Sequence, residues 1–557
     1  MYDPAGSGMY DPAGDASYHI TLLHGIGVTD SEGAIIPLAR QPALVLFALI
    51  LGAGAGGGPV TAERLLDLAW EESKRPSSLH ALHQAISKLR KIFGPQVIRR
   101  LEQIDGYEFV LGKGIRVDWH DFCLLAQTAH GLDATDSRTA ALMWADALSV
   151  WSPATLGKLP ATIEMDRLRK SLIDAYLDAL QQQTEVLLHI GDQSRIATSL
   201  PSIVREYSDR DRLRELLMIA LYRCGRTAES IALYEELREE RAQRHLQPSP
   251  GIQTAYQRIL DNDPAMFQPA LAPLTPADQA VHDSGQTDIH STDTVRMANF
   301  LLVTDPHSRD AYSTPADRYC SIRVGLFVTE TARLERENVM FASRCVRQAA
   351  AEMGISRFLE LGTPPPNPWS LAKVADVACP GGGRIVSATA DPYLVRHLRS
   401  RYGHQPGATY IQGTIRDFER LIQHPAVRDL LGLDLPPDER EPVLIIDEHD
   451  INSTSEAFDP HGIYSHLTDQ LASGSRLGLT AVSTKGISKV ARAELGKVYK
   501  GHPYPIAFRT QDEVAALVPD GMQVLPPGVI DTHRILGTSR DEFDHQWHQY
   551  SFCAQKP

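Results

Sequence analysis

The sequence predicts a multidomain protein with three folded parts: a winged helix-turn-helix, an all-α domain and a doubly wound α/β domain. Three observations lead to this fold class. Residues 18–114 combine short apolar strands with three helical segments, residues 115–262 have helical periodicity almost throughout, and strands alternate with helices from residue 290 onward. At about 150 residues per domain, the 557 residues also allow three or four domains.

Two segments of the chain have the composition of linkers. Residues 1–17 contain the sequence MYDPAG twice and little to bury, so we expect a disordered extension in which Met9 is an alternative start. Residues 263–289 are rich in Pro, Ala and Asp and lack periodicity, which is typical of an interdomain tether. The expected boundaries are therefore 1–17, 18–114, 115–262, 263–289 and 290–557.

The composition is that of a globular protein with an acidic balance. Hydrophobic residues make up 43% of the chain and charged residues 22%, and the formal net charge is −14. The six cysteines include no C-x-x-C pair, which disfavours a metal site or a disulfide framework and is typical of a reducing compartment. The apolar stretch 43–58 has about ten strongly apolar residues, whereas a membrane span needs about 20. We therefore expect a cytoplasmic protein with no membrane partner.

The first folded part is predicted from the order of its elements. Small strands within 18–28 precede a helix over 41–53, and a second helix over 60–70 has Thr61 as its expected cap. A third helix over 77–94 precedes a two-stranded hairpin over 97–112 that turns near Asp105-Gly106. Strands, three helices and a hairpin form a winged helix-turn-helix, in which the third helix enters the DNA major groove and the hairpin approaches the backbone.

The third helix is basic in an acidic chain. From Ser73 to Leu101 there are seven Lys or Arg residues and no Asp or Glu, which is the local charge pattern expected for binding a polyanion. The alternative is a solvated helix face, which is what most charged faces are. The predicted DNA contacts are Lys74, Arg75, His83, Gln84, Ser87, Lys88, Arg90, Lys91, Arg99 and Arg100.

These motifs resemble the DNA-binding domain of SARP-family regulators, which activate antibiotic biosynthesis clusters and have an OmpR-like winged helix. The resemblance rests on an ordered series of residues: Thr61, Leu65, Trp70, Leu82, Ser87, Lys88, Leu89, Arg90, Lys91, Gly94, Gly106 and Tyr107. The chain departs from the family at 71–76, where two basic residues are added, and its helix face with His83 and Gln84 is its own. The operator sequence therefore cannot be transferred from the family.

The helical part resembles the bacterial transcriptional activator domain of the same family. The stretch 117–122 (VDWHDF) is similar to the opening of that domain, and 246–260 is similar to its closing helix. Between them, 213–240 predicts paired helices around a Gly-Arg turn with the small/large pattern of tetratricopeptide-type repeats. Trp144 and Trp151 are expected in the core. The resemblance implies a homodimer on direct DNA repeats and contact with RNA polymerase.

The second half resembles a family of S-adenosylmethionine-dependent methyltransferases. The likeness covers about residues 290–540 and predicts strands that end in a ligand crevice. The expected strands are 356–362, 384–390, 408–413, 442–448 and 476–483.

Four departures fall on positions that hold the cofactor in this family. Pro364, Pro365 and Pro366 occupy the turn after the first strand, where glycines would let the backbone approach a ligand. Thr389 stands at the first acidic position of the family's Asp-x-Asp-Pro, Thr414 stands at an acidic position after the third strand, and 303–310 replaces a glycine-rich stretch. The retained residues predict only a vestigial cofactor site: Glu360, Gly362, Asp391 and Asp417.

The stretch 447–450 (DEHD) follows another predicted strand. His449 between acids could act as a general base, but no nucleophile is placed near it by the sequence, and hydrogen-bonded loop residues are the expected alternative.

We therefore interpret the chain as a sequence-specific DNA-binding transcriptional regulator, an activator of a secondary-metabolite cluster, that is not an enzyme and uses no cofactor. Its second half is expected to act in regulation, in dimerisation or in sensing a small molecule in its crevice. The alternative is an active S-adenosylmethionine-dependent methyltransferase that its N-terminal half targets to DNA.

Overall fold

The computed structural model describes most of the chain in two compact units, residues 1–274 and 275–557. The described ranges are 18–30, 33–53, 57–76, 78–111, 114–133, 135–152, 156–157, 159–263, 266, 297, 301, 315–328, 331–363, 370–403, 405–487, 489–498, 506–536 and 547–557. The predicted extension 1–17, the segment 303–310, Pro364 to Pro366 and almost all of 263–289 lie outside these ranges.

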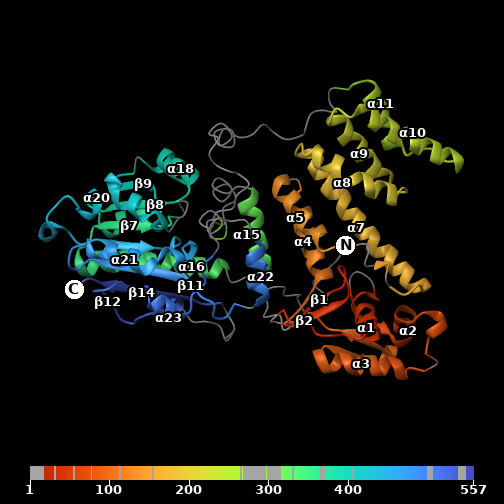
Figure 1. The fold of residues 1–557 in the computed structure, drawn as a ribbon, viewed down its shortest axis with the longest axis horizontal. Coiled ribbons are helices and arrows are strands. Elements are labelled where there is room, and N and C mark those ends of the chain that lie inside the picture. Colours follow the sequence, from red (N-terminus) through yellow and green to blue (C-terminus); the bar gives the residue numbers. More distant parts are fainter. Residues whose placement is uncertain are drawn as a thin grey trace. The chain divides into compact units, whose positions relative to one another are not determined.

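The first unit begins with three helices between short strands (Figure 1). One three-stranded sheet has the order β2-β1-β6 and the other has the order β3-β5-β4. The elements are β1 (Tyr18–Thr21), β2 (Gly27–Asp30), α1 (Arg40–Leu51), β3 (Val60–Thr61), α2 (Ala62–Ala69), η1 (Glu72–Lys74), α3 (His80–Phe93), β4 (Ile98–Leu101), η2 (Glu102–Ile104), β5 (Gly106–Phe109) and β6 (Ile115–Val117).

Local sequence signals explain where these elements begin and end. The Thr61 hydroxyl accepts a hydrogen bond from the Arg64 backbone N–H, so the predicted cap of α2 is confirmed. Helix α3 ends at Gly94, whose φ of +89° is accessible to glycine at little cost. The predicted hairpin is confirmed as the antiparallel pair β4–β5, and Asp105 turns the chain with a φ of +42°.

The strand β6 joins the first sheet from beyond the expected boundary at 114/115. It pairs in parallel with β1, with Ile20 opposite Val117. The next residue, Asp118, starts α4 and accepts hydrogen bonds from the backbone N–H groups of Leu22 and Leu23. Residues 115–118 are therefore built into the sheet that contains β1.

The rest of the first unit is helical, as the periodicity predicts. Its helices are α4 (Asp118–Leu132), α5 (Ser137–Ser149), α7 (Ile163–His189), α8 (Gln193–Glu206), α9 (Asp211–Arg223), α10 (Thr227–Gln243) and α11 (Pro250–Leu260). Trp144 and Trp151 are buried, which confirms their expected place in the core. The predicted turn between paired helices is also confirmed, because Gly225 separates α9 from α10 with a φ of +76°.

The second unit is built on one eight-stranded sheet. The strand order is β12-β14-β11-β10-β7-β8-β9, and β13 pairs with β14. All five predicted strands are present and run parallel, and β14 is an antiparallel addition that the sequence analysis did not predict. The strands are β7 (Arg357–Leu361), β8 (Arg384–Thr389), β9 (Ala408–Gln412), β10 (Leu444–Asp447), β11 (Arg476–Val482), β12 (Gln523–Val524), β13 (Ile530–Asp531) and β14 (Gln549–Gln555).

Helices cover both faces of this sheet, which is the doubly wound arrangement (Figure 1). Alternate residues of β10 show the two faces: Leu444 and Ile446 pack against α16 and α17, whereas Ile445 packs in a second cluster with α19, α20 and α21. The larger helices are α15 (Pro315–Phe327), α16 (Thr331–Met353), α17 (Leu371–Ala378), α18 (Pro392–Tyr402), α19 (Phe418–Gln423), α20 (Pro425–Leu431), α21 (Pro460–Asp469) and α22 (Lys489–Val498). The short ones are η4 (Ile415–Asp417), η5 (Pro437–Glu439), η6 (Ile451–Ser453), η7 (Glu456–Phe458), α23 (Gln511–Ala515) and α24 (Thr532–Leu536).

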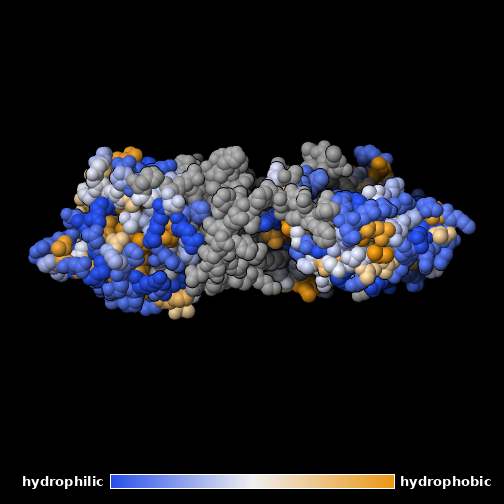
Figure 2. Space-filling model, turned by 90° about the horizontal axis from the view of Figure 1, so that it is seen from above, coloured by the Kyte–Doolittle hydropathy of each residue, from blue (hydrophilic) through white to orange (hydrophobic). Residues whose placement is uncertain are grey.

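The surface of each unit is mixed. On the face in Figure 2, hydrophilic residues make up most of the described surface and apolar residues form small patches between them. Among the described helices, none combines the length and the apolar character that a bilayer span requires. All six cysteines are free thiols.

Candidate functional sites

Helix α3 has one buried side and one polar, exposed side. Its buried residues are Leu82, Ala85, Ile86, Leu89 and Phe93, at spacings of three and four. The exposed residues include His83, Gln84, Ser87, Lys88 and Lys91. The predicted apolar stripe therefore packs the helix against the domain core. The side chains of α3 that are predicted to contact DNA, other than Arg90, lie together on its exposed side.

Arg90 differs from Lys88 and Lys91 on the same helix because its side chain is half-buried and contacts the hairpin. Its Nε donates to the Ile98 carbonyl oxygen at 2.9 Å, and its guanidinium lies 5.8 Å from the centre of the Tyr107 ring. Ile98 begins β4 and Tyr107 lies in β5, so Arg90 ties α3 to the hairpin. Its role in the structure is to position these two elements.

The remaining predicted cations are exposed, and three of the four, Lys74, Arg75 and Arg100, lie beside acids. Lys74 Nζ is 2.7 Å from Glu71, and Arg75 Nε is 2.9 Å from Asp67. On the hairpin, Arg100 lies 3.6 Å from Asp105, and Arg99 Nε donates to the carbonyl oxygen of Gln96. The sequence window without acids therefore overstates the local positive charge, because the folded chain brings Glu71 and Asp67 next to it.

In the second unit, the carboxyl ends of β7, β8, β9 and β10 meet at one edge of the sheet. Glu360 and Asp391 are buried there, at the ends of β7 and β8. Burial raises the pKa of Glu360 to about 7, and the Thr363 hydroxyl donates to its carboxyl at 3.2 Å. Asp417 is exposed on η4. The structure thus places Glu360 and Asp391 at this edge of the sheet and leaves Asp417 on the surface.

Gly362 is required by the packing of the protein itself. Its φ is +72°, and a Cβ at this position would lie 2.5 Å from the backbone nitrogen of Asp450 and 2.9 Å from His449 Cβ. The segment after β10 therefore crosses directly over Gly362. The retention of glycine here has a structural cause and does not require a cofactor.

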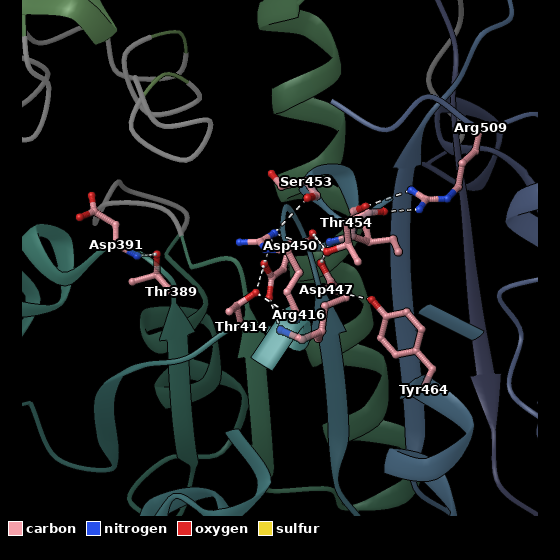
Figure 3. A network of polar contacts seen from close by, with 12 residues as sticks. Thr389, Asp391, Thr414, Arg416, Asp447, Asp450, Ser453, Thr454, Tyr464 and Arg509 are labelled. Atoms are coloured by element: carbon pink, nitrogen blue, oxygen red, sulfur yellow. Dashed lines mark hydrogen bonds and ion pairs between the residues drawn. The ribbon is translucent and has the colours of Figure 1, made fainter. Parts of the chain in front are cut away.

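Asp450, which follows β10, contacts the segment that follows β9, although β7 and β8 lie between these two strands in the sheet (Figure 3). One carboxylate oxygen accepts from the Thr414 hydroxyl at 2.8 Å and lies 3.1 Å from Arg416. The other accepts from the Ile415 backbone N–H at 2.7 Å. Thr414 stands where the sequence analysis expects a family acid, so in this chain the position supplies a donor to a neighbouring carboxylate.

Asp447 and Arg509 extend this network on the other side of β10 (Figure 3). Asp447 accepts from the Tyr464 hydroxyl at 2.6 Å, and its pKa is raised to about 7 by burial and by the charge of Asp450. Arg509 donates to the Ile451 carbonyl oxygen at 3.0 Å and also to that of Thr454. These groups are hydrogen-bonded to one another, which is how buried polar groups are normally stabilised.

A second group of polar side chains lies beside this network without such partners. Glu448 is 1% exposed and neither of its carboxyl oxygens has a hydrogen-bond partner. His449 is 5% exposed, its Nε2 is unpaired, and this atom lies 3.8 Å from Glu335 Oε2. Burial lowers the pKa of His449 to about 4 and raises that of Glu335 to about 8.

The expectation for 447–450 is therefore confirmed in one half and wrong in the other. The side chains of Asp447 and Asp450 are hydrogen-bonded, whereas those of Glu448 and His449 are not. Glu335 was missed because it lies on α16, more than 100 residues away in sequence, and no spacing rule connects it to β10. Among the described residues, no group of His, Cys, Asp or Glu is arranged to hold a metal ion.

Comparisons with protein families divide the chain in the same way as its structure. A family model described as a bacterial transcriptional activator domain matches residues 117–260, and a model described as S-adenosyl methyltransferase matches residues 280–557. In its domain make-up, the chain is similar to SARP-type regulators in its first half and to S-adenosyl methyltransferases in its second half. The helical region and the α/β sheet described above are these two parts.

The SARP-type half has curated relatives in Streptomyces. It is 31% identical to the regulatory protein AfsR of Streptomyces coelicolor over 244 residues, which is 43% of this chain and 24% of AfsR. It is 24% identical to the transcriptional regulator RedD of the same organism over 298 residues, which is 50% of this chain and 81% of RedD. The chain thus spans about a quarter of the length of AfsR.

Two solved structures each align over about half of the chain. A DUF574 family protein from Streptomyces avermitilis aligns over 48% of this chain and 99% of its own, at 22% identity and a TM-score of 0.42. Mycobacterium tuberculosis EmbR, solved in complex with a low affinity phosphopeptide, aligns over 48% of this chain and 71% of its own, at 20% identity and a TM-score of 0.40.

Proposed function

We propose that this protein is a sequence-specific DNA-binding transcriptional regulator that activates a secondary-metabolite cluster. The observation that carries the proposal is the two-sided character of α3, with an apolar seat and an exposed face of hydrogen-bonding and basic side chains. Residues 18–114 would act as a winged helix-turn-helix, with α3 in the major groove and the hairpin β4–β5 as the wing.

The exposed residues divide into two kinds of DNA contact. His83, Gln84 and Ser87 carry groups that donate to or accept from base edges, so they would read sequence. Lys88 and Lys91 would contact phosphates, together with the wing residues Arg99 and Arg100, and would set the affinity and its dependence on salt. Arg90 would act indirectly, by holding the wing against α3.

The test is binding to the DNA upstream of the neighbouring genes, measured by fluorescence anisotropy at several salt concentrations. Replacing both Lys88 and Lys91 by Ala should weaken binding and lower the magnitude of the salt slope by about 0.9 for each phosphate that is no longer neutralised. Lys170→Ala is the matched control, because it removes the same charge from an exposed position on α7. Unchanged affinity and slope in the double variant would contradict the assignment of α3.

For the helical part, we propose a TPR-like array that contacts RNA polymerase and supports a homodimer on direct repeats. This rests on the match to the bacterial transcriptional activator domain and on the paired helices α9 and α10 around Gly225. Sedimentation velocity on DNA with one or two half-sites tests the dimer. A single copy of the protein bound across two half-sites would contradict it.

For the methyltransferase-like domain, we propose a regulatory role without methyl transfer. The support is that Thr414 and Asp450 bind each other where the family has a cofactor contact, and that Gly362 is explained by packing. Calorimetry with S-adenosylmethionine and its demethylated product should show no binding in the low micromolar range.

The second candidate is an S-adenosylmethionine-dependent methyltransferase that the N-terminal half directs to DNA. It is favoured by the family match to residues 280–557 and by Glu360 and Asp391, which lie buried at the ends of adjacent strands. Low-micromolar cofactor binding, followed by methyl incorporation into DNA or protein, would replace the regulatory proposal with this one.

A further inference from the structure

The polar side chains that follow β10 differ in whether the protein provides them with hydrogen-bond partners. The carboxyl groups of Asp447 and Asp450 are hydrogen-bonded by Tyr464, Thr414 and the backbone. Glu448, between them in sequence, has no partner on either oxygen. An unsatisfied buried polar group destabilises the fold, and it does so more strongly if it is charged. A fold that satisfies Asp447 and Asp450 so fully leaves Glu448 as an exception that needs a cause.

The unsatisfied atoms come from two elements and gather in one place. Glu448 and His449 follow β10, and Glu335 and Asn338 stand one turn apart on α16, which packs against the same end of the sheet. The Asn338 amide nitrogen donates to the Glu448 backbone carbonyl at 2.9 Å, which fixes the two elements together. The Asn338 Oδ1, the His449 Nε2 and Glu335 Oε2 are unpaired.

One member of the cluster is partly exposed. The side chains of Glu448 and His449 are nearly fully buried, whereas that of Glu335 is 20% exposed. Burial raises the pKa of Glu448, and the charges of Glu360 and Glu335 raise it further, so the three carboxyl groups are near one another. The nearby guanidinium groups are engaged elsewhere: Arg416 is paired with Asp450, and Arg333 with Glu337.

Neither a metal ion nor protonation provides the partners that these unpaired side chains lack. Among the described residues, no set of ligands is grouped as a metal requires. Protonation of Glu448 would create an O–H donor that also lacks a partner, because neither of its oxygens has a neighbour within hydrogen-bond distance. A protonated amine or a guanidinium carries several donors and a positive charge, which is the chemistry that several carboxyl groups, an amide oxygen and an imidazole nitrogen can accept.

We propose that Glu448, Glu335, His449 and Asn338 form a binding site for a small molecule that carries a protonated amine or a guanidinium. The ligand enters past Glu335, and its cationic end takes hydrogen bonds to Glu448 at the inner end. This site is distinct from the Thr414–Asp450 network, and it goes beyond the proposed regulatory function because its occupancy does not depend on DNA.

The test uses the full-length chain and agmatine, which has a primary amine at one end and a guanidinium at the other. Agmatine should raise the melting temperature, while the neutral molecule 1-butanol at the same concentration should not. Glu448→Leu should abolish the agmatine shift and should itself raise the melting temperature without ligand, by at least about 2 °C, because it replaces an unsatisfied carboxyl with an apolar side chain.

Asp450→Asn is the matched control, two residues away, and should lower the melting temperature because that carboxylate is fully bound. Glu335→Gln is a second variant at the entrance, and it should weaken the agmatine shift without loss of folding. A Glu448→Leu variant that is less stable than the wild type would show a structural carboxyl and overturn the proposal. An agmatine shift of equal size in wild type and Glu448→Leu would mean binding to the acidic surface, and would also overturn it.

Calorimetry with S-adenosylmethionine separates the two sources of the amine. Binding of agmatine alone assigns the site to a free amine. Binding of S-adenosylmethionine that is lost in Glu448→Leu assigns the site to the amino group of that molecule and contradicts the cofactor-free part of the proposed function. Binding of S-adenosylmethionine that Glu448→Leu leaves intact, with no agmatine shift in the wild type, overturns the site.

Discussion

The hydroxyl of Thr414, which follows β9, donates to Oδ1 of Asp450, which follows β10, at 2.8 Å. The same carboxylate lies 3.1 Å from Arg416 and accepts from the Ile415 backbone N–H. Thr414 therefore acts as a hydrogen-bond donor to a carboxylate, at a position where the sequence predicts an acid.

Changes at Thr414 test this relationship. Thr414→Val removes the donor and should lower the free energy of unfolding by about 1 kcal/mol. Thr414→Asp should cost more, because it places a second carboxyl group against Asp450. Guanidinium denaturation of the full-length protein measures both changes. A Thr414→Asp variant that was as stable as the wild type and bound S-adenosylmethionine would contradict this relationship. The hydrogen bond to Asp450 would then not explain why residue 414 is a threonine.

Two glycines with the same φ allow the cost of backbone strain to be separated from the cost of a steric clash. Gly362 and Gly381 both have a φ of +72°, but a Cβ on Gly381 meets nothing within 4 Å, whereas one on Gly362 lies 2.5 Å from Asp450 N. Gly381→Ala should cost about 1–2 kcal/mol for the left-handed conformation alone. Gly362→Ala should cost about 1–3 kcal/mol more, because the segment after β10 must move. Equal losses in denaturation experiments would contradict the close contact.

Arg90 should behave as a positioning residue for the wing. Arg90→Ala removes the bond to the Ile98 carbonyl and the contact with the Tyr107 ring, and should lower the stability of the first unit by about 1–2 kcal/mol. Arg90→Lys should not restore this stability, because a lysine cannot donate to the Ile98 carbonyl and also place a planar cation against the Tyr107 ring. Increased hydrogen exchange in β4 and β5, without a change in α7, would be the signature. A variant with native exchange but reduced DNA binding would instead make Arg90 a direct contact.

The second unit should lose stability as the pH rises from 6.5 to 8. Glu335, Glu360 and Asp447 have pKa values raised to about 8, 7 and 7, so the folded state holds protons that the unfolded state has released. The free energy of unfolding therefore falls with pH across this range. His449, with its pKa lowered to about 4, acts in the opposite direction only below 6.5.

Hydrogen exchange in β7 and β10, corrected for the intrinsic effect of pH, measures this loss. Glu335→Gln should flatten the dependence between pH 7 and 8, because the glutamine amide does not titrate. Stability that rises steadily from pH 6.5 to 8 would contradict the raised pKa values.

The elements whose periodicity is local could be predicted from the sequence. The stripe of α3, the cap at Thr61 and the five parallel strands each depend on neighbouring residues, and the structure contains all of them. The antiparallel strand β14 could not be predicted, because its pairing with β11 joins segments about 70 residues apart in sequence. The pairing of β6 with β1, across the predicted boundary at 114/115, likewise joins segments almost 100 residues apart.

The sites divide in the same way. Exposure on α3 follows from the helical period, so the positions of His83, Gln84, Ser87, Lys88 and Lys91 could be predicted together. Lys74 and Glu71 are only three residues apart in sequence. The pairing of Arg75 with Asp67 and the approach of Glu335 to His449 instead depend on contacts between separate elements, which no local pattern encodes. The packing of Asp450 on Gly362 is likewise a tertiary contact that the sequence does not reveal.

The pairing of β6 with β1 has a consequence for how a promoter would be read. Because α4 starts directly after β6, and Asp118 binds the backbone of Leu22 and Leu23, the activator helices have a fixed direction relative to α3. If α3 lies in a major groove, a polymerase-contacting surface on those helices points to one side of the double helix. Activation would then depend on rotational phase: five base pairs inserted between operator and promoter would disrupt it, and about ten, a full helical turn, would largely restore it.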